Sequence, residues 1–453
     1  MKKTFAVIAA VLFVLSFAAS AFAIHAEIPA DTQAIVAKGS TQINLGGEIR
    51  IRGWYYDNLG IPNGAAVNGI PQDSNSKANY DQRVRLTLDA AVAPGVTGRI
   101  MLETGNADAL TTDIYSWGRL NQKPNGTTTF QEAWIQYTGT GLFGFNAGLK
   151  AGHMPLKLGE GIFFDNTQYG DDAIVFFMDP TKELHIGLLT IKASEGASTT
   201  TTPVLGGNNN NSNDLDAYVG LFTYKIAPTH TLGMNYTYIN QSNASLKFQN
   251  ISLHGNGTAG NFGYKFEADF QFGSIGDGHA EADFGGWAVA LAGNYKMDKL
   301  NLRGMFAYGS GDDEAGGDID EFQTLVGGIQ HYTFVYDYRA GTAATDAALS
   351  GLSGRAGTGI ANTTVYNLGL DYQWNKDIKS KFDAYYLRAS ESRHGGSKDI
   401  GIELDAQLSY QLAKNLNYTI NAGFLFTGDF YKDLYGVDSK NATVVNNVLT
   451  LSF

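Results

Sequence analysis

Apolar and polar residues alternate with a period of two through most of the chain after residue 40. In the stretch 41–55 one face would carry Ile43, Leu45, Ile49, Ile51 and Tyr55, and the other Gln42, Asn44, Glu48, Arg50 and Arg52. The stretch 261–272, "NFGYKFEADFQF", repeats the pattern with aromatic residues on one side. Successive side chains of a β-strand point to opposite sides, so the pattern predicts strands with one apolar and one polar face.

Eighteen segments show this pattern, and most are close to the ~9–11 residues that a tilted strand needs to cross a bilayer. They are residues 41–56, 79–91, 96–104, 129–138, 143–152, 171–178, 184–193, 214–225, 230–239, 247–255, 260–272, 284–296, 299–309, 362–373, 379–390, 399–411, 415–426 and 445–453.

The connections between these segments alternate between short and long. The short ones have turn chemistry: Ala93-Pro94-Gly95, Gly139-Thr140-Gly141, Asp179-Pro180-Thr181, Ala227-Pro228-Thr229, Asn256-Gly257, Met297-Asp298-Lys299, Asn375-Lys376-Asp377 and Ala413-Lys414. The longer ones include 57–78, 105–128, 153–170, 194–213, 310–361 and 427–444. Outer-membrane barrels have short periplasmic turns and long external loops, which would leave both termini in the periplasm.

We therefore predict an all-β fold, a transmembrane antiparallel up-and-down β-barrel of about 18 strands, with 16 as the alternative, formed by residues 41–453. The composition agrees, with 55 Gly, 26 Phe and 24 Tyr against only 9 Pro, which favours strands and turns. A water-soluble β-sandwich is the other all-β fold to consider. It would not need aromatic faces pointing outward on so many strands.

The N-terminus has the features of a secretory signal peptide. Lys2 and Lys3 precede an apolar run, and the small residues Ala21 and Ala23 precede the expected cleavage site, which makes residues 1–23 the signal peptide. An uncleaved anchor helix is the alternative, but the run is short for a ~30 Å hydrocarbon core. Residues 24–40 are expected to be an N-terminal periplasmic segment, in which Asp31-Thr32 would cap a short helix ending at Gly39.

Several functional classes are disfavoured by composition and motifs. The chain has no cysteine, which removes disulfides, thiolate catalysis and c-type haem attachment, and no cofactor is expected. A formal net charge of −12 argues against nucleic acid as a partner. G-x-S-x-G, H-E-x-x-H and P-loop motifs are missing from the sequence. We expect no enzyme; a hydrolase assembled from Ser and His of neighbouring strands is the alternative.

The polar faces of the strands give a set of candidate pore-lining residues, because the polar face of such a barrel lines the lumen. The basic patch comprises Arg50, Arg52, Arg83, Arg85 and Arg99. The acidic candidates are Glu48, Asp81, Glu103, Glu267, Asp269, Asp371, Asp383, Glu403 and Asp405. Walls of opposite charge would bias which ions pass. Alternatively, these charges pair along the inner wall and only stiffen the barrel.

Long loops are the expected source of a constriction, since a barrel of this strand number leaves a channel. The loops 105–128 and 153–170 are candidates to fold inward. The longest, 310–361, begins with an acidic cluster whose residues Asp312, Asp313, Asp318 and Asp320 are candidate ligands for a divalent cation. A solvated acidic loop is the simpler interpretation.

Several stretches resemble known outer-membrane proteins. The first strand "QINLGGEIRIRGWY", the second "YDQRVRLTLDAAV" and the terminal Phe453 resemble Gram-negative outer-membrane porins. The stretches "FQEAWIQYTG", "AGLKAGHMPLKLGEGIFF" and "IELDAQLSYQLAKNLNYTINAGFLFTGDFY" resemble the alginate-export type of eighteen-stranded channel. The chain is also similar to the porin-like proteins of metal-reducing δ-proteobacteria.

The resemblance implies a channel in the outer membrane and, for the alginate type, an arginine-lined conduit for an anionic polymer. Such a conduit would fall on the basic patch. The acidic residues beside it fit a general porin for ions and small hydrophilic solutes better, and this is the expected function. The alternatives are a channel for an anionic polysaccharide and a structural barrel that partners surface electron-transfer proteins.

The expected partners are outer-membrane lipid and lipopolysaccharide and the barrel-assembly machinery. Many porins are homotrimers and the alginate type is monomeric, so the resemblance leaves both states open. The last strand should pair with 41–56, because an open edge cannot lie in hydrocarbon. Its outward residues Leu449, Leu451 and Phe453 resemble the signal that the assembly machinery recognises in its clients.

Overall fold

The computed structural model describes most of the chain from residue 36 onward. The described residues are 36–38, 41–59, 76–105, 115–118, 127–141, 144–194, 214–241, 245–276, 281–312, 317–324, 333–338, 360–392, 395–435 and 440–453. The predicted signal peptide and most of the segment 24–40 lie outside them. None of the helices within the described ranges has the length and hydropathy of a membrane span.

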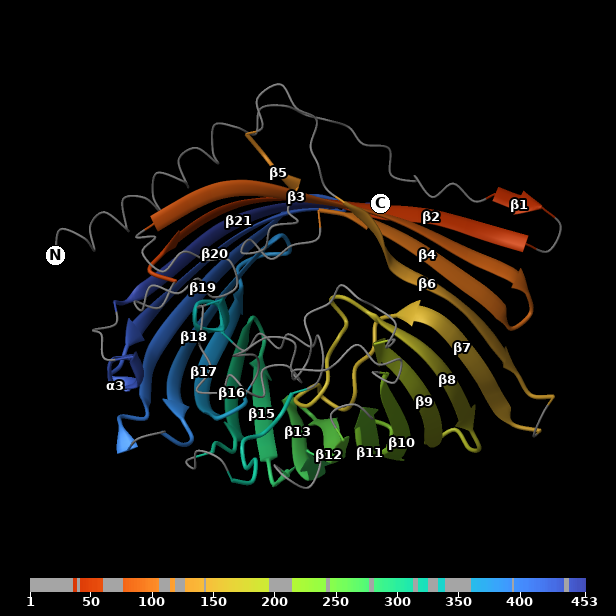
Figure 1. Ribbon diagram of the computed structural model, residues 1–453. Coiled ribbons are helices and arrows are strands. Elements are labelled where there is room, and N and C mark those ends of the chain that lie inside the picture. The colour runs from red at the N-terminus through yellow and green to blue at the C-terminus, as the bar shows by residue number, and fades with distance from the viewer. Residues whose placement is uncertain are drawn as a thin grey trace. The chain divides into compact units, whose positions relative to one another are not determined.

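Residues 35–453 form one unit, an antiparallel β-barrel of 18 long strands (Figure 1). The strands are β2 (Thr41–Asp57), β3 (Ser76–Ala93), β4 (Val96–Thr104), β6 (Thr128–Gly139), β7 (Asn146–Met154), β8 (Asp171–Asp179), β9 (Leu184–Ser194), β10 (Leu215–Ala227), β11 (His230–Gln241), β12 (Leu246–Ala259), β13 (Phe262–Ile275), β15 (Trp287–Met297), β16 (Leu300–Gly309), β17 (Thr363–Gln373), β18 (Ile378–Ala389), β19 (Asp399–Ala413), β20 (Leu416–Thr427) and β21 (Ala442–Ser452). The predicted fold class and strand number are confirmed.

The first and last long strands close the ring. β2 pairs with β21 in an antiparallel register that runs from Glu48↔Ser452 to Asp57↔Thr443. The other long strands pair with their neighbours along the chain. Closure satisfies the backbone hydrogen bonds that an edge would leave open, which a strand in hydrocarbon requires. The expected pairing of the terminal strand with the first one is therefore confirmed.

Short elements complete the described structure. β1 (Val36–Lys38) pairs with the start of β2, β5 (Tyr115–Ser116) with β3, and β14 (Ala282–Asp283) with β13. The 3₁₀ helix η2 (Tyr336–Tyr338) lies in the longest loop, and α3 (Phe430–Tyr435) lies between β20 and β21.

Two local predictions are wrong. Val36–Lys38 form a strand with Thr41–Ile43 as partners and not the end of a helix, because the chain folds back on β2. Asn256-Gly257 is not a turn, since both residues remain in the ladder between β11 and β13. The turn follows three residues later at Gly260, whose φ of 61° lies in the left-handed region that glycine tolerates.

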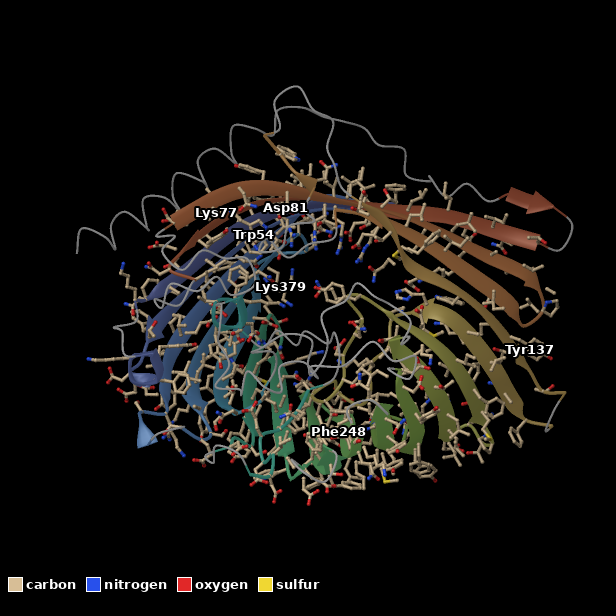
Figure 2. All side chains as sticks on the ribbon, in the orientation of Figure 1. Trp54, Lys77, Asp81, Tyr137, Phe248 and Lys379 are labelled. Carbon is tan, nitrogen blue, oxygen red and sulfur yellow. The ribbon has the colours of Figure 1, made fainter. Side chains whose placement is uncertain are left out.

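The two faces of the sheet differ as the alternation predicts. On β2 the outward Leu45 and Tyr55 are 37% and 44% exposed, whereas the inward Arg52 and Trp54 are 6% and 5% exposed. Large apolar side chains cover the outward face of the other strands as well, with Leu368 on β17 reaching 75% exposure. Figure 2 shows Trp54 and Lys379 on the side of the sheet that faces the interior. The outer surface is thus suited to lipid and the inner one to water.

Candidate functional site

The basic patch lies on three adjacent strands, β2, β3 and β4. In the β2–β3 register Arg50 is directly opposite Arg83, Glu48 is opposite Arg85, and Arg52 is opposite Asp81. The same inner face continues onto β4, where Arg99 is opposite Asp89. The structure therefore brings the five arginines of the patch together on one wall, interleaved with carboxylates.

Four of the five arginines form ion pairs within this wall. Arg52 Nε lies 2.8 Å from Asp81 Oδ1, and the indole nitrogen of Trp54 donates to Asp81 Oδ2 at 2.8 Å. The other three pairs are Arg83 with Glu48 at 2.5 Å, Arg85 with Glu103, and Arg99 with Asp89 at 2.6 Å. These pairs neutralise most of the charge that the sequence assigned to the patch.

Arg50 is the exception among the five. No ion pair joins its guanidinium to a carboxylate of the described residues, and its Nε atom is buried without a hydrogen-bond partner. Arg83, which faces it across the ladder, already holds Glu48. Arg50 is therefore the one arginine of the patch without a carboxylate partner of its own among the described residues.

A second ion-pair cluster lies on β16, β17 and β18. Arg303 donates to Asp371 at 2.9 Å and to Asp383 at 2.8 Å, so one guanidinium bridges two strands. Lys379 lies 3.6 Å from Asp371. Two of the predicted acidic residues are thus balanced by cations of their own wall.

A segment of the longest loop folds into the barrel and is held by Glu403 of β19. The backbone nitrogens of Phe334, Val335 and Tyr336 donate to the Glu403 carboxylate at 2.8, 2.6 and 2.8 Å. Phe334 also donates to Asp405 at 3.2 Å, and its ring stacks on Trp54 with 6.4 Å between centroids. Hydrogen bonds from backbone N–H groups to a carboxylate are among the stronger ones in proteins.

The loop between β7 and β8 also folds inward and is held by Glu267 of β13. Glu267 accepts hydrogen bonds from the backbone nitrogens of Glu160 at 2.6 Å and Ile162 at 3.4 Å. Phe163 is 2% exposed and stacks on Phe248 of β12, with 6.0 Å between the ring centroids. The segment 155–170 therefore reaches from β7 and β8 to a wall five strands away, as predicted for the loop 153–170.

The burial of several acidic residues corrects their predicted role. Glu103, Glu267, Asp269 and Glu403 are at most 1% exposed, so they do not face water in the interior as pore-lining residues would. Glu267 and Glu403 instead accept from inward-folded loop segments, and Asp269 accepts from Asn250 at 2.9 Å. The alternation of β13 and β19 predicts that these side chains point inward, but nothing in it indicates which loop covers them.

Two further loop predictions have different outcomes. In the loop 105–128 the described part includes β5, which pairs with β3 and lengthens the wall there, and Trp117 stacks on the exposed Tyr80. This described part does not narrow the interior.

In the acidic loop, Asp318 accepts from the backbone of Asp283, and Ser310 donates to the backbone oxygen of Asp320. Asp313 lies outside the described residues. The described His, Asp and Glu side chains form no group of three or more that could hold a metal ion.

The predicted assembly residues lie on the outward face of β21. Leu449 is opposite Ile51 and Leu451 is opposite Ile49, both on the outward face of β2. Phe453 is 39% exposed and is bonded to Gly47 at the start of the barrel.

Comparison with known proteins agrees with this architecture. The pattern of the family described as "Alginate export" matches residues 41–445, which is nearly the whole barrel. The chain belongs to the alginate export family. No curated protein matches the sequence.

Solved structures similar to this member of the alginate export family include three from Pseudomonas aeruginosa. OpdL has a TM-score of 0.55 at 12% identity, OccK8 (OprE) 0.54 at 13%, and OccK5 (OpdH) 0.54 at 11%. Each alignment covers 90% of this chain and 98% of the other. At identities this low, the TM-scores show that the fold is shared and nothing more. The family and the apolar outer belt mark the protein as an outer-membrane barrel.

Proposed function

We propose that the protein is an outer-membrane channel through which ions and small hydrophilic solutes diffuse passively. The observation that carries the proposal is the inner face of the barrel. It is polar on most strands, and the segments 155–170 and 333–338 fold against it and are held by Glu267 and Glu403. A barrel of 16–18 strands is too wide for its own side chains to fill. Inward-folded loops then narrow the channel and set the size of the solutes that pass.

The charge distribution supports weak selectivity among ions. Ion pairs compensate Arg52, Arg83, Arg85 and Arg99 on one wall and Asp371 and Asp383 on another. Polar side chains of such a wall replace part of a solute's hydration shell as it passes. Arg50 is the residue whose charge would bias the current toward anions.

We further propose that both termini of the chain lie on the periplasmic side of the membrane. Phe453 and the start of β2 lie at the end of the barrel that carries the short turns, next to Asn415 and to the β3–β4 turn. Outer-membrane barrels keep their short turns in the periplasm.

A planar bilayer recording tests the proposal. The purified protein should produce stepwise, voltage-independent conductance in potassium chloride, and the conductance should rise with salt concentration. Heat-modifiable mobility in gel electrophoresis controls for correct folding of each preparation. Folded protein that inserts but carries no current would refute the channel and favour a structural barrel.

A second candidate, a conduit for an anionic polysaccharide, has one specific support beside the family. Arg50 places on the inner wall a guanidinium without a direct carboxylate partner among the described residues, where a polyuronate could bind. Alginate oligomers should then interrupt the current at concentrations where neutral dextran oligomers of equal length do not. Equal effects of the two polymers would leave the general channel as the better description.

A further inference from the structure

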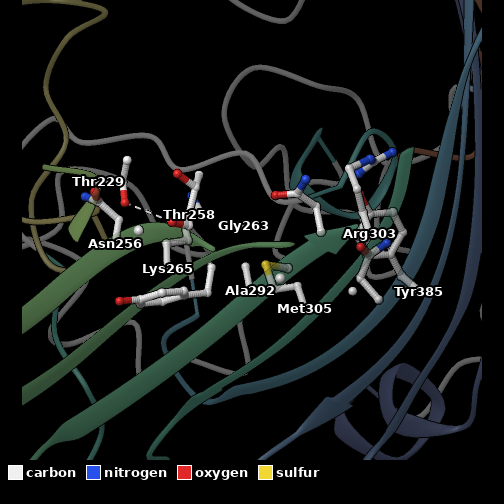
Figure 3. A pocket seen from close by; sticks show the side chains of 15 residues that line it. Thr229, Asn256, Thr258, Gly263, Lys265, Ala292, Arg303, Met305 and Tyr385 are labelled. Carbon is white, nitrogen blue, oxygen red and sulfur yellow. Dashed lines mark hydrogen bonds between the residues drawn. The ribbon is translucent and has the colours of Figure 1, made fainter. Parts of the chain in front are cut away.

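A recess of about 550 Å³ opens on the inner face of the strands β13, β15, β16, β17 and β18 (Figure 3). Its lining includes Lys265, Ala292, Arg303, Asn367 and Tyr385. Its volume is within the range of about 300–1,000 Å³ that is usual for small-molecule sites. In the closed ring of 18 strands these five strands are four to eight positions from β2 by the shorter way round, and β13 and β15 lie across the interior from the basic patch (Figure 1).

The floor of the recess consists of two rows of residues that face one another across successive strands. One row runs from Gly263 through Asn294, Arg303 and Gly369 to Asp383. The other runs from Lys265 through Ala292, Met305 and Asn367 to Tyr385. The space over Gly369 is filled by the side chains of Asp383 and Arg303, with which a Cβ atom on Gly369 would collide.

The recess is bounded by the inward-folded loop 155–170. Glu160 of this loop accepts a hydrogen bond from Asn256 at 2.8 Å and lies 3.8 Å from Lys265. On the side of the long loops, the neighbouring row of inward-facing residues includes Ala307, Val365 and Leu387. These apolar side chains are at most 2% exposed. The recess thus lies on the short-turn side of the narrowed part of the barrel.

The polar groups of the recess balance one another in charge. Arg303 bridges Asp371 and Asp383, and Lys379, which lies 3.6 Å from Asp371, supplies the second positive charge for these two carboxylates. Lys265 is opposed by Glu160. The Asn294 amide donates one hydrogen bond, to Asn301 at 2.9 Å, and the Asn367 amide donates two, to Asp383 at 3.1 Å and to the backbone oxygen of Ala384 at 3.4 Å. Both keep their side-chain carbonyl oxygens available. Among the described residues no hydrogen bond is formed by the Tyr385 hydroxyl. Such a lining offers several uncharged donors and acceptors and no surplus charge.

We propose that this recess is a binding site for a small, neutral, polyhydroxylated solute of one or two sugar rings. The proposal rests on the channel function and names the solute class that the channel favours. Closely spaced hydroxyl groups can pair with the amides and with the phenol, which would otherwise be hydrated. A site that matches hydroxyl groups rejects analogues that lack them, because its polar atoms are then left unpaired. An anion would meet the carboxylates of Glu160, Asp371 and Asp383 as well as the two cations.

Block of the single-channel current by maltose tests this site. Maltose should reduce the current in a saturable way, whereas a polyethylene glycol of matched size should reduce it only in proportion to solution viscosity. Ala292→Phe fills the recess without changing charge, and we expect it to raise the half-blocking maltose concentration roughly tenfold or more. Tyr385→Phe removes one hydroxyl and should raise that concentration roughly 2- to 10-fold.

The matched control adds the same bulk elsewhere on the inner face. Thr419 of β20 faces the interior beside Ser409, five strands from Ala292, so Thr419→Phe should leave maltose block unchanged.

Wild-type current that falls only with viscosity would overturn the site while leaving the channel function intact. Tighter block by glucuronate than by glucose would overturn the neutral solute class. Equal loss of block in Thr419→Phe and Ala292→Phe would mean that the bore, not the recess, holds the sugar. A folded protein without conductance would refute the channel function itself, and the site with it.

Discussion

Gly47 and Phe453 exchange two backbone hydrogen bonds, with N···O distances of 2.8 and 3.0 Å, and so close the barrel at the end that carries the short turns. The Phe453 ring lies over Gly47, where a Cβ atom would come within 2.7 Å of its Cζ atom. The last residue of the chain is therefore part of the seam between the first and last strands and is not a frayed end.

Deletion of Phe453, or its replacement in Phe453→Glu, should impair assembly into the membrane. Deletion removes both hydrogen bonds to Gly47. A charge on the outward face of a barrel strand is destabilising, by roughly 2–4 kcal/mol for Arg or Lys at the bilayer midplane and by less for Glu and near the interface. The measurement is the fraction of heat-modifiable barrel in outer-membrane preparations. Phe453→Tyr is the control, and we expect it to assemble normally. Wild-type levels of folded barrel for the deletion would show that the seam closes without its terminal residue.

The strand pattern of this barrel is predictable because each strand has one face in lipid and one face toward water. The first and last segments show this, since the side chains of Ile49 and Leu451 face lipid as their alternation predicts. Register follows from the short turns, so Arg50 was expected close to Arg83. Turn positions are less secure, because Asn256-Gly257 has turn chemistry but continues in the ladder to Ala259.

The interior is less predictable because it depends on contacts between distant parts of the chain. The inward orientation of Glu267 and Glu403 is encoded locally, but their partners are backbone nitrogens more than 60 positions away. Backbone N–H groups are present in every residue and leave no signal in the sequence. The aromatic residues of "GIFF" at 161–164 are a local signal for an inward loop, since Phe163 would be poorly placed in water.

Glu403→Gln should loosen the segment 333–338 and raise the single-channel conductance. The carboxylate accepts from three backbone nitrogens, and hydrogen bonds to a charged group contribute about 1.5–3 kcal/mol each. An amide offers one acceptor oxygen and turns an NH₂ group toward the remaining donors. Chymotrypsin should also cleave faster at Phe334 or Tyr336, which are otherwise held against the wall.

Glu391→Gln is the matched control for this change. Glu391 pairs with Lys398 at 2.7 Å at the rim of the barrel, where the pair contributes little. The control should keep wild-type conductance and wild-type protease resistance. If Glu403→Gln behaves like the control, the segment is held by packing of Phe334 on Trp54 and not by the carboxylate.

Phe163→Ala should free the tip of the loop 155–170 and increase current noise. Phe163 is almost fully buried against Phe248, and Phe→Ala changes at buried sites cost about 3–5 kcal/mol. The barrel itself should stay folded, because its strands do not depend on this side chain. Phe262→Ala, on the outward face with 46% exposure, is the control that should leave the noise unchanged. Quiet current in Phe163→Ala would show that the contacts of Glu267 suffice to hold the loop.

Arg50→Glu should shift the selectivity of the channel toward cations more than any other single change in the basic patch. At about 10 Å in water a unit charge contributes about 0.4 kcal/mol, so reversing it alters the energies of a cation and an anion by about 0.8 kcal/mol in opposite directions. Salt screening reduces this to a change of roughly a few-fold in the permeability ratio. The reversal potential in a potassium chloride gradient measures this permeability ratio.

Arg388→Glu makes the same charge change on the exposed outward face of β18, where it should not alter selectivity. An equal shift in both variants would mean that net charge, rather than the unpaired guanidinium inside the barrel, sets the preference for ions.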